Sequence, residues 1–191
     1  MYTELMFYID GEWTLGDADR TCAVLNPATG GEIGRLPLAS RSDLDAALAA
    51  ASRGFEAWSV TSAYDRSAIL RRAAALVRER HEHMARCMTL DQGKPLAEST
   101  LEAKSAADHI EWYAEEGRRA YGRIVPSRNP AVRQLVVREP VGPVVAFTPW
   151  NFPINQAVRK IAGALAAGCS IIIKAPEEAP GSVIELVRCF H

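Results

Sequence analysis

The chain has 191 residues, of which 48% are hydrophobic and 24% charged, and these values are typical of a globular protein with one sizeable core. Its net charge of -1 argues against a nucleic-acid-binding protein, and no uncharged apolar run is long enough to span a membrane. Because the N-terminal residues lack the basic start of a signal peptide, we expect a cytoplasmic protein.

The first forty residues predict short strands separated by turns. The apolar segments Phe7–Ile9 and Val24-Leu25 are followed by the turn-forming pairs Asp10-Gly11 and Asn26-Pro27. From Ser42 onwards the spacing of apolar residues changes from strand-like to helical.

Three helices are predicted in the next part of the chain. Ser42-x-x-Asp45 resembles a capping box, and the helix that it starts has a regularly spaced apolar set: Leu44, Leu48, Ala51 and Phe55. A second helix is predicted from about Tyr64 to Thr89, ended by Gly93 and Pro95. Its expected apolar stripe is Ile69, Ala73, Leu76, Val77 and Met84, and its expected solvent side is Arg71, Arg72, Arg78 and Arg80. A third helix is predicted from about Leu96 to Ala120.

Residues 123–139 differ from the helices before them. Prolines and an Asn-Pro pair come first, and a β-like run from Arg133 to Arg138 follows. The alternation of polar and apolar residues in this run is poor. We therefore expect an arm that pairs elsewhere rather than a central strand.

The segment after the arm predicts a βαβ unit. Val144 to Phe147 is a short apolar strand, Ile154 to Ala167 is helical, and Ile171 to Ile173 is a second β-branched strand. Gly168 is placed as the C-cap of the helix. Strands joined by such a crossover pair in parallel, so the fold class is α/β. The last residues, Val183 to Phe190, have the spacing of an amphipathic helix.

Asn151 follows the first strand of this unit and lies between two prolines that restrict the backbone. A neutral amide held on a rigid turn suits the stabilisation of a developing oxyanion. The alternative is an Asn that caps the next helix, and the spacing of residues does not separate the two roles.

Lys174 ends the second strand, so its ammonium is expected at the same sheet edge, where α/β proteins bind cofactors. Glu177 lies three residues further on, past Pro176. A Lys and a carboxylate held together can bind the hydroxyls of a ribose. The alternative is an exposed ion pair of little energetic weight.

Other common sites have little support. The glycines of residues 30–34 and 93 match neither the dinucleotide-binding G-x-G-x-x-G pattern nor a P-loop. His81 and His83 are two residues apart on a helix, so they point in different directions and no metal site is expected. The four scattered cysteines are expected to be small buried hydrophobes: Cys22, Cys87, Cys169 and Cys189.

Together these segments resemble the aldehyde dehydrogenase superfamily, closest to its succinate-semialdehyde dehydrogenase branch. The similarity covers essentially the whole chain, and its motifs lie at residues 26–30, 91–95, 138–153, 164–169 and 174–177. The resemblance implies the N-terminal part of the family fold: a Rossmann-like cofactor domain from 1–122 and 140–191, and a bridging arm over 123–139. By this resemblance, we expect the catalytic domain of the family to lie outside these 191 residues.

The resemblance also implies a mechanism and a set of residue roles. In this family a cysteine thiolate attacks the aldehyde, hydride passes to NAD(P)+, and a glutamate base helps water to hydrolyse the thioester. Asn151 matches the oxyanion donor. Lys174 and Glu177 match the ribose contacts, and Thr148, Pro149 and Trp150 match the cofactor cleft. We expect NAD rather than NADP, because Glu177 would repel a 2′-phosphate.

Arg159 matches the arginine that binds the far carboxylate of the substrate in the succinate-semialdehyde branch. The alternative is a surface arginine. The resemblance further implies that the nucleophilic Cys, the general-base Glu and the C-terminal oligomerisation strand of the family lie outside these 191 residues. We therefore expect a fragment that is inactive alone, from an enzyme that forms a dimer or tetramer. The rival interpretation is a natural short binding or assembly module.

Overall fold

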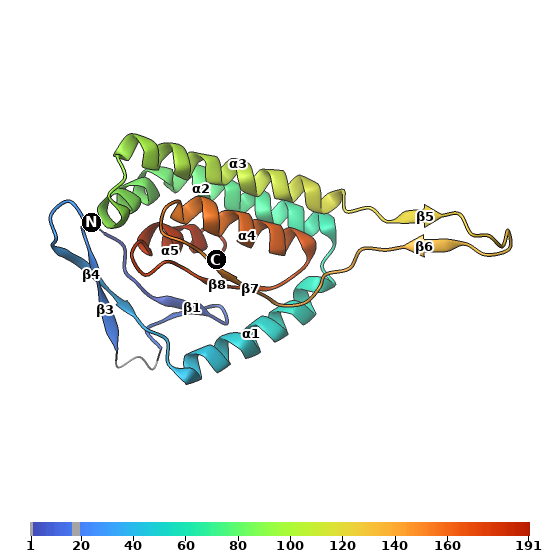
Figure 1. Ribbon diagram of the computed structural model, residues 1–191, viewed down its shortest axis with the longest axis horizontal. Helices are drawn as coiled ribbons and strands as arrows, with labels where there is room; N and C mark the ends of the chain where they lie inside the picture. The colour runs from blue at the N-terminus through green and yellow to red at the C-terminus, as the bar shows by residue number, and fades with distance from the viewer. Residues whose placement is uncertain (1, 17–19) are drawn as a thin grey trace.

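The structure is a computed structural model that describes residues 2–16 and 20–191 (Figure 1). Five helices lie in these residues: α1 (Arg41–Ser59), α2 (Ala63–Gln92), α3 (Leu96–Arg118), α4 (Pro153–Ala167) and α5 (Gly181–Val187). The strands are β1 (Phe7–Ile9), β2 (Glu12–Thr14), β3 (Thr21–Leu25), β4 (Glu32–Pro37), β5 (Arg123–Val125), β6 (Gln134–Val136), β7 (Val144–Phe147) and β8 (Ile171–Lys174).

The core lies between α2, α3 and α4, and α5 packs against α2 and α4 (Figure 1). Small side chains on α3, among them Ala103, Ala106 and Ala107, are fully buried and let the neighbouring helices approach closely. The larger buried side chains fill the space between the helices: Leu70, Val77, Met84, Met88, Ile110, Ile154, Val158 and Leu186. Because α4 also connects the strands of the βαβ unit, its packing against α2 and α3 fixes that unit in the fold.

The predicted second helix is confirmed and is longer at its C-terminal end than expected. Gly93 has φ 84° and caps α2, a backbone conformation that glycine adopts without strain. Ala73, Val77 and Met84 of the predicted stripe are buried, whereas Ile69 and Leu76 are only half-buried. The buried residues differ from the predicted stripe because α2 contacts three other helices. Its buried face is therefore wider than one row of side chains.

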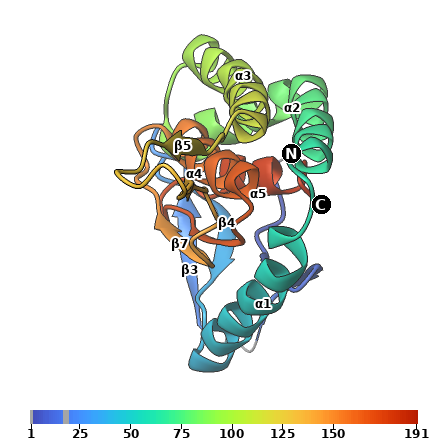
Figure 2. The same ribbon diagram turned by 90° about the vertical axis from the view of Figure 1, so that its right-hand side faces the viewer.

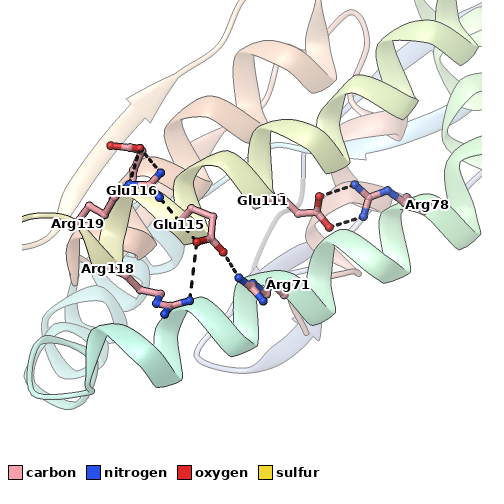
Figure 3. A network of polar contacts seen from close by, with 7 residues as sticks. All are labelled: Arg71, Arg78, Glu111, Glu115, Glu116, Arg118 and Arg119. Carbon is pink, nitrogen blue, oxygen red and sulfur yellow. Dashed lines mark hydrogen bonds and ion pairs between the residues drawn. The ribbon is translucent and has the colours of Figure 1, made fainter.

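Two of the four arginines expected to face only solvent on α2 instead bind α3 (Figure 3). Arg78 makes a bidentate contact with Glu111, with N···O distances of 2.6 and 2.8 Å, and Arg71 pairs with Glu115. The Glu111 carboxylate raises the pKa of Arg78, and the guanidinium lowers the pKa of Glu111. These four side chains are 35% to 53% exposed, so water screens each pair and it contributes little stability.

The start of the first helix differs from the prediction. The capping box of α1 is Ser40 with Asp43, in which Asp43 N donates to Ser40 Oγ and Ser40 N donates to Asp43 Oδ2. Figure 2 shows α1 apart from the pair of α2 and α3. Consequently Leu44 and Leu48 are 53% and 52% exposed, although their spacing is that of a buried stripe.

The N-terminal strands form two antiparallel hairpins, β1–β2 and β3–β4. Asp10 and Gly11 both have positive φ, 53° and 84°, as a two-residue hairpin turn requires. The arm is a third hairpin, in which β5 and β6 pair with each other and every residue of these two strands is exposed. It projects far from the rest of the chain (Figure 1).

The predicted βαβ unit is confirmed. β7 and β8 pair in parallel, with Val144 opposite Ile171 and Phe147 opposite Lys174, and α4 connects them. Gly168 has φ 89° and caps α4. Because the described sheet has only these two strands, Val145 and Phe147 stay 51% and 71% exposed. No helix in the described ranges has the length and apolarity needed to cross a membrane.

Candidate functional site at the carboxyl ends of β7 and β8

The predicted site residues from 148 to 151, with 174 and 177, gather where the two parallel strands end. Thr148 is buried, and its backbone N and its Oγ1 both donate to Lys174 O, at 3.2 and 3.1 Å. These bonds hold the two strand ends together. Pro149 and Trp150 follow and are exposed, with Trp150 at 52%.

Lys174 and Glu177 form the expected pair on the loop after β8. Lys174 Nζ lies 3.0 Å from Glu177 Oε1, and the side chains are 48% and 55% exposed. Water screens a pair of this exposure, so it stabilises the fold by little. Both groups can exchange this contact for hydrogen bonds to a ligand.

The structure separates the two roles that the sequence left open for Asn151. The N-cap of α4 is Phe152, with no side-chain capping bond, so Asn151 does not cap the helix. Asn151 is exposed, and its side chain makes no hydrogen bond to any described residue. Its amide is therefore free to donate to a ligand.

A buried ion pair that was not predicted from the sequence binds the backbone of this turn. Lys94 Nζ lies 2.5 Å from Glu102 Oε2 and donates to Asn151 O at 3.2 Å. The other carboxylate oxygen, Glu102 Oε1, accepts from Asn155 N at 3.1 Å. Glu102 thus supplies the cap that α4 lacks, and Lys94 fixes the peptide beside the free amide.

The ion pair of Lys94 and Glu102, called the clamp below, is tightly packed. Lys94 and Glu102 are 9% and 4% exposed, and Lys94 Nζ lies 4.1 Å from the centroid of the Phe152 ring. The sequence signal for Lys94 was present, since Gly93-Lys94-Pro95 belongs to one of the motifs noted above. Nothing in the local pattern around Glu102 distinguishes it from a surface carboxylate on α3.

Arg159 lies on α4, beside an open hollow of about 510 Å³. The hollow is lined by Asp108, His109, Trp112, Tyr113 and Arg159. Arg159 Nε donates to His109 Nε2 at 3.1 Å, so the arginine is anchored to α3. Asn151 is not among the lining residues, and the described contacts do not join the two predicted residues directly.

The cysteines and histidines add no second site. Cys87, Cys169 and Cys189 are buried as expected, and Cys22 is only half-buried because it lies in the hairpin strand β3. Burial raises the pKa of Cys87 to about 12 and that of Cys189 to about 11, which disfavours both as nucleophiles. Among the described residues, no group of three His, Cys, Asp or Glu side chains could hold a metal ion.

Comparison with known proteins yields one family. A sequence profile of the aldehyde dehydrogenase family matches residues 13–191. The chain is 50% identical over 183 residues to 4-(hydroxymethyl)benzenesulfonate dehydrogenase TsaD1 of Comamonas testosteroni, covering 96% of this chain and 38% of that relative. It is 42% identical to the succinate-semialdehyde dehydrogenase [NADP(+)] GabD of Escherichia coli, covering 94% of this chain and 37% of the relative.

A solved structure gives the same result. The succinate-semialdehyde dehydrogenase of Burkholderia pseudomallei superposes with a TM-score of 0.95 at 40% identity, covering 99% of this chain and 39% of that one. The chain therefore spans well under half the length of the relatives that it matches.

Proposed function

Because the chain belongs to the aldehyde dehydrogenase family, we propose that it is the N-terminal portion of an NAD(P)-dependent enzyme that oxidises an acidic semialdehyde, such as succinate semialdehyde, to the carboxylate. The observation that carries this proposal is the turn at Asn151. Its backbone is clamped by Lys94, whereas its side-chain amide is unpaired among the described residues and exposed.

In this proposal Asn151 donates its amide N–H to the oxyanion that forms when a thiolate attacks the aldehyde. A donor held still before the reaction stabilises the new charge without reorganisation. In the complete enzyme, Asn151→Ala should lower kcat roughly 10²- to 10³-fold. Asn129→Ala, an exposed asparagine on the arm, is the control and should change kcat little. A loss of only two- to threefold for Asn151→Ala would refute the assignment.

We assign Lys174 and Glu177 to the ribose of the cofactor, with Thr148, Pro149 and Trp150 beside them. NAD is the proposed cofactor, because the Glu177 carboxylate would repel the 2′-phosphate of NADP. The E. coli relative is named as an NADP(+) enzyme. The cofactor preference of this enzyme is therefore tested by comparing kcat/KM for NAD+ and NADP+. A higher kcat/KM with NADP+ than with NAD+ would overturn it, and Glu177→Gln should shift the ratio towards NADP+.

Arg159 is proposed to bind the far anionic group of the substrate. A guanidinium binds a carboxylate or sulfonate through two parallel hydrogen bonds and discriminates against uncharged aldehydes. The names of the relatives support an acidic substrate, since succinate semialdehyde and a benzenesulfonate both carry an anion. Arg159→Ala should raise KM for succinate semialdehyde, and an unchanged KM would refute this role.

We further propose that these 191 residues are inactive alone. They span 37–38% of the curated relatives named above, and the two cysteines with a raised pKa are poor nucleophiles. We assign residues 1–122 and 140–191 to the cofactor domain and 123–139 to the bridging arm of a dimeric or tetrameric enzyme in the cytoplasm. Turnover by the purified 191-residue chain would disprove its proposed inactivity. For the complete enzyme, size-exclusion chromatography would test the oligomeric state and cell fractionation would test the cytoplasmic location.

The exposed hairpin β5–β6 favours one alternative, a short assembly module that docks on a full-length relative. The coding sequence after the codon for His191 separates the two proposals. A continuing frame with a G-x-T-x-x-G segment supports the enzyme fragment, and a stop codon supports the module.

A further inference from the structure

The histidine that holds Arg159 is itself fixed by a second hydrogen bond. His109 Nδ1 lies 2.7 Å from Ser105 O, and His109 Nε2 lies 3.1 Å from Arg159 Nε. A backbone carbonyl can only accept, so Nδ1 carries the proton. A guanidinium N–H can only donate, so Nε2 presents its lone pair. The neutral Nδ1–H tautomer of His109 satisfies both contacts at once.

This arrangement determines which part of Arg159 is available to a ligand. A guanidinium presents five N–H groups in one planar fork. The Nε–H of Arg159 is used by His109, so an anion cannot bind through Nε together with one terminal nitrogen. The two terminal nitrogens remain, and they form no ion pair with any described residue. An anion can therefore bind only to the outer edge of the fork.

The one acid in the lining of the hollow is engaged elsewhere. Asp108 would repel an anionic ligand, but its carboxylate lies 3.1 Å from Arg78 Nη2 on α2. Besides His109, whose ring nitrogens contact Ser105 O and Arg159, the lining contains Trp112 and Tyr113, which are aromatic and carry no charge. Arg159 is thus the cation that an anion entering the hollow would meet.

We propose that His109 is a positioning residue that orients Arg159 for the far anionic group of the substrate. The histidine acts through the arginine: it sets the plane of the guanidinium and directs the terminal nitrogens into the hollow. This inference rests on the proposed role of Arg159. It identifies His109 as the side chain that orients the arginine and so makes it selective for acidic aldehydes.

The test compares His109→Leu with His109→Gln in the complete enzyme. Leu removes the acceptor, whereas Gln retains a side-chain oxygen that can accept from Arg159 Nε. Two substrates of equal carbon number are used, succinate semialdehyde and the uncharged butanal. We expect His109→Leu to raise KM for succinate semialdehyde about five- to tenfold, the contribution of one hydrogen bond of ordinary strength. Its kcat and its KM for butanal should change less than twofold, and His109→Gln should recover most of the loss.

The double variant shows whether His109 acts through Arg159. In an Arg159→Ala background, His109→Leu should have no further effect on KM. His81→Leu is the matched control, because His81 Nδ1 also lies 2.7 Å from a backbone carbonyl, that of Arg78, but no arginine side chain among the described residues donates to its ring. This control variant should leave KM unchanged for both succinate semialdehyde and butanal.

Each contrary outcome has a distinct meaning. If His109→Leu raises KM equally for both substrates, the histidine has only a structural role and the inference fails. If Arg159→Ala raises KM for succinate semialdehyde and His109→Leu does not, the inference fails while the proposed function stands. If Arg159→Ala has no effect either, the proposed substrate class is wrong and the inference falls with it.

Discussion

Two lysine–glutamate pairs lie near the same sheet edge, and they differ in burial. Lys94 and Glu102 have side chains that are 7% and 2% exposed, and both also bind the backbone around Asn151. Lys174 and Glu177 are 48% and 55% exposed and contact mainly each other. The residue types are the same, but one pair shapes the turn and the other remains available to a ligand.

The difference shows that burial, rather than residue type, decides what an ion pair does. A buried pair that loses one partner leaves a charge without water, so it is rarely broken. An exposed pair is exchanged for water or a ligand at little cost. Asp91 extends the comparison, because it is buried and accepts from Tyr2 Oη and Gly181 N but pairs with no cation among the described residues.

The largest effect is expected at the buried pair. Glu102→Ala leaves the Lys94 ammonium buried and removes the acceptor of Asn155 N, so it should lower the free energy of unfolding by about 3 to 5 kcal/mol. Urea unfolding followed by circular dichroism measures the loss. Glu102→Gln retains the acceptor and should cost less. Glu98→Ala, an exposed acid on the first turn of the same helix, should cost no more than about 1 kcal/mol. A loss below about 1 kcal/mol for Glu102→Ala would contradict the clamp.

Asp91 should make stability depend on pH in the acid range. Burial raises its pKa from 3.8 to about 6, although Tyr2 Oη and Gly181 N both donate to its Oδ2. Between these values the folded chain holds a proton that the unfolded chain has released. The contribution of Asp91 to stability is therefore fully present below about pH 4, is lost as pH rises through about 6, and amounts to about 2 to 3 kcal/mol.

Asp91→Asn tests this pH dependence because the amide keeps an acceptor oxygen and cannot ionise. The variant should match the original protein near pH 4 and exceed it in stability at pH 7. Urea midpoints at both pH values give the comparison. Parallel pH profiles for the two proteins would show that Asp91 does not titrate as described.

The smallest effect on stability is expected at the exposed pair. Lys174→Ala should change the free energy of unfolding by less than about 1 kcal/mol, because the pair is half-exposed and screened. In the complete enzyme it should instead raise KM for NAD+ severalfold. Lys160→Ala is the control, since Lys160 Nζ binds Gln156 on its own helix. A large loss of stability with an unchanged KM for NAD+ would show that Lys174 has a structural role, like Lys94, and does not bind the cofactor.

Much of the local structure was predictable because it depends on neighbours in the sequence. The glycine C-caps at Gly93 and Gly168 follow from the left-handed backbone that ends these helices. The capping box of α1 shows the limit of this reasoning. Ser40-x-x-Asp43 and Ser42-x-x-Asp45 overlap by one residue pair in the sequence, and the structure uses the first.

The five helices, the parallel βαβ unit and the family could all be predicted from the sequence, whereas the strands β2, β4 and β5 were not predicted. The sequence also placed the rigid turn that carries Asn151. Only the tertiary structure excluded a helix cap at Asn151 and identified the side chains that hold the predicted residues. Those contacts join residues far apart in the chain: Lys94 to Asn151, Glu102 to Asn155 and His109 to Arg159, separated by 57, 53 and 50 positions. They exist because α3 packs beside α4, and no local pattern encodes which side chains that packing brings together.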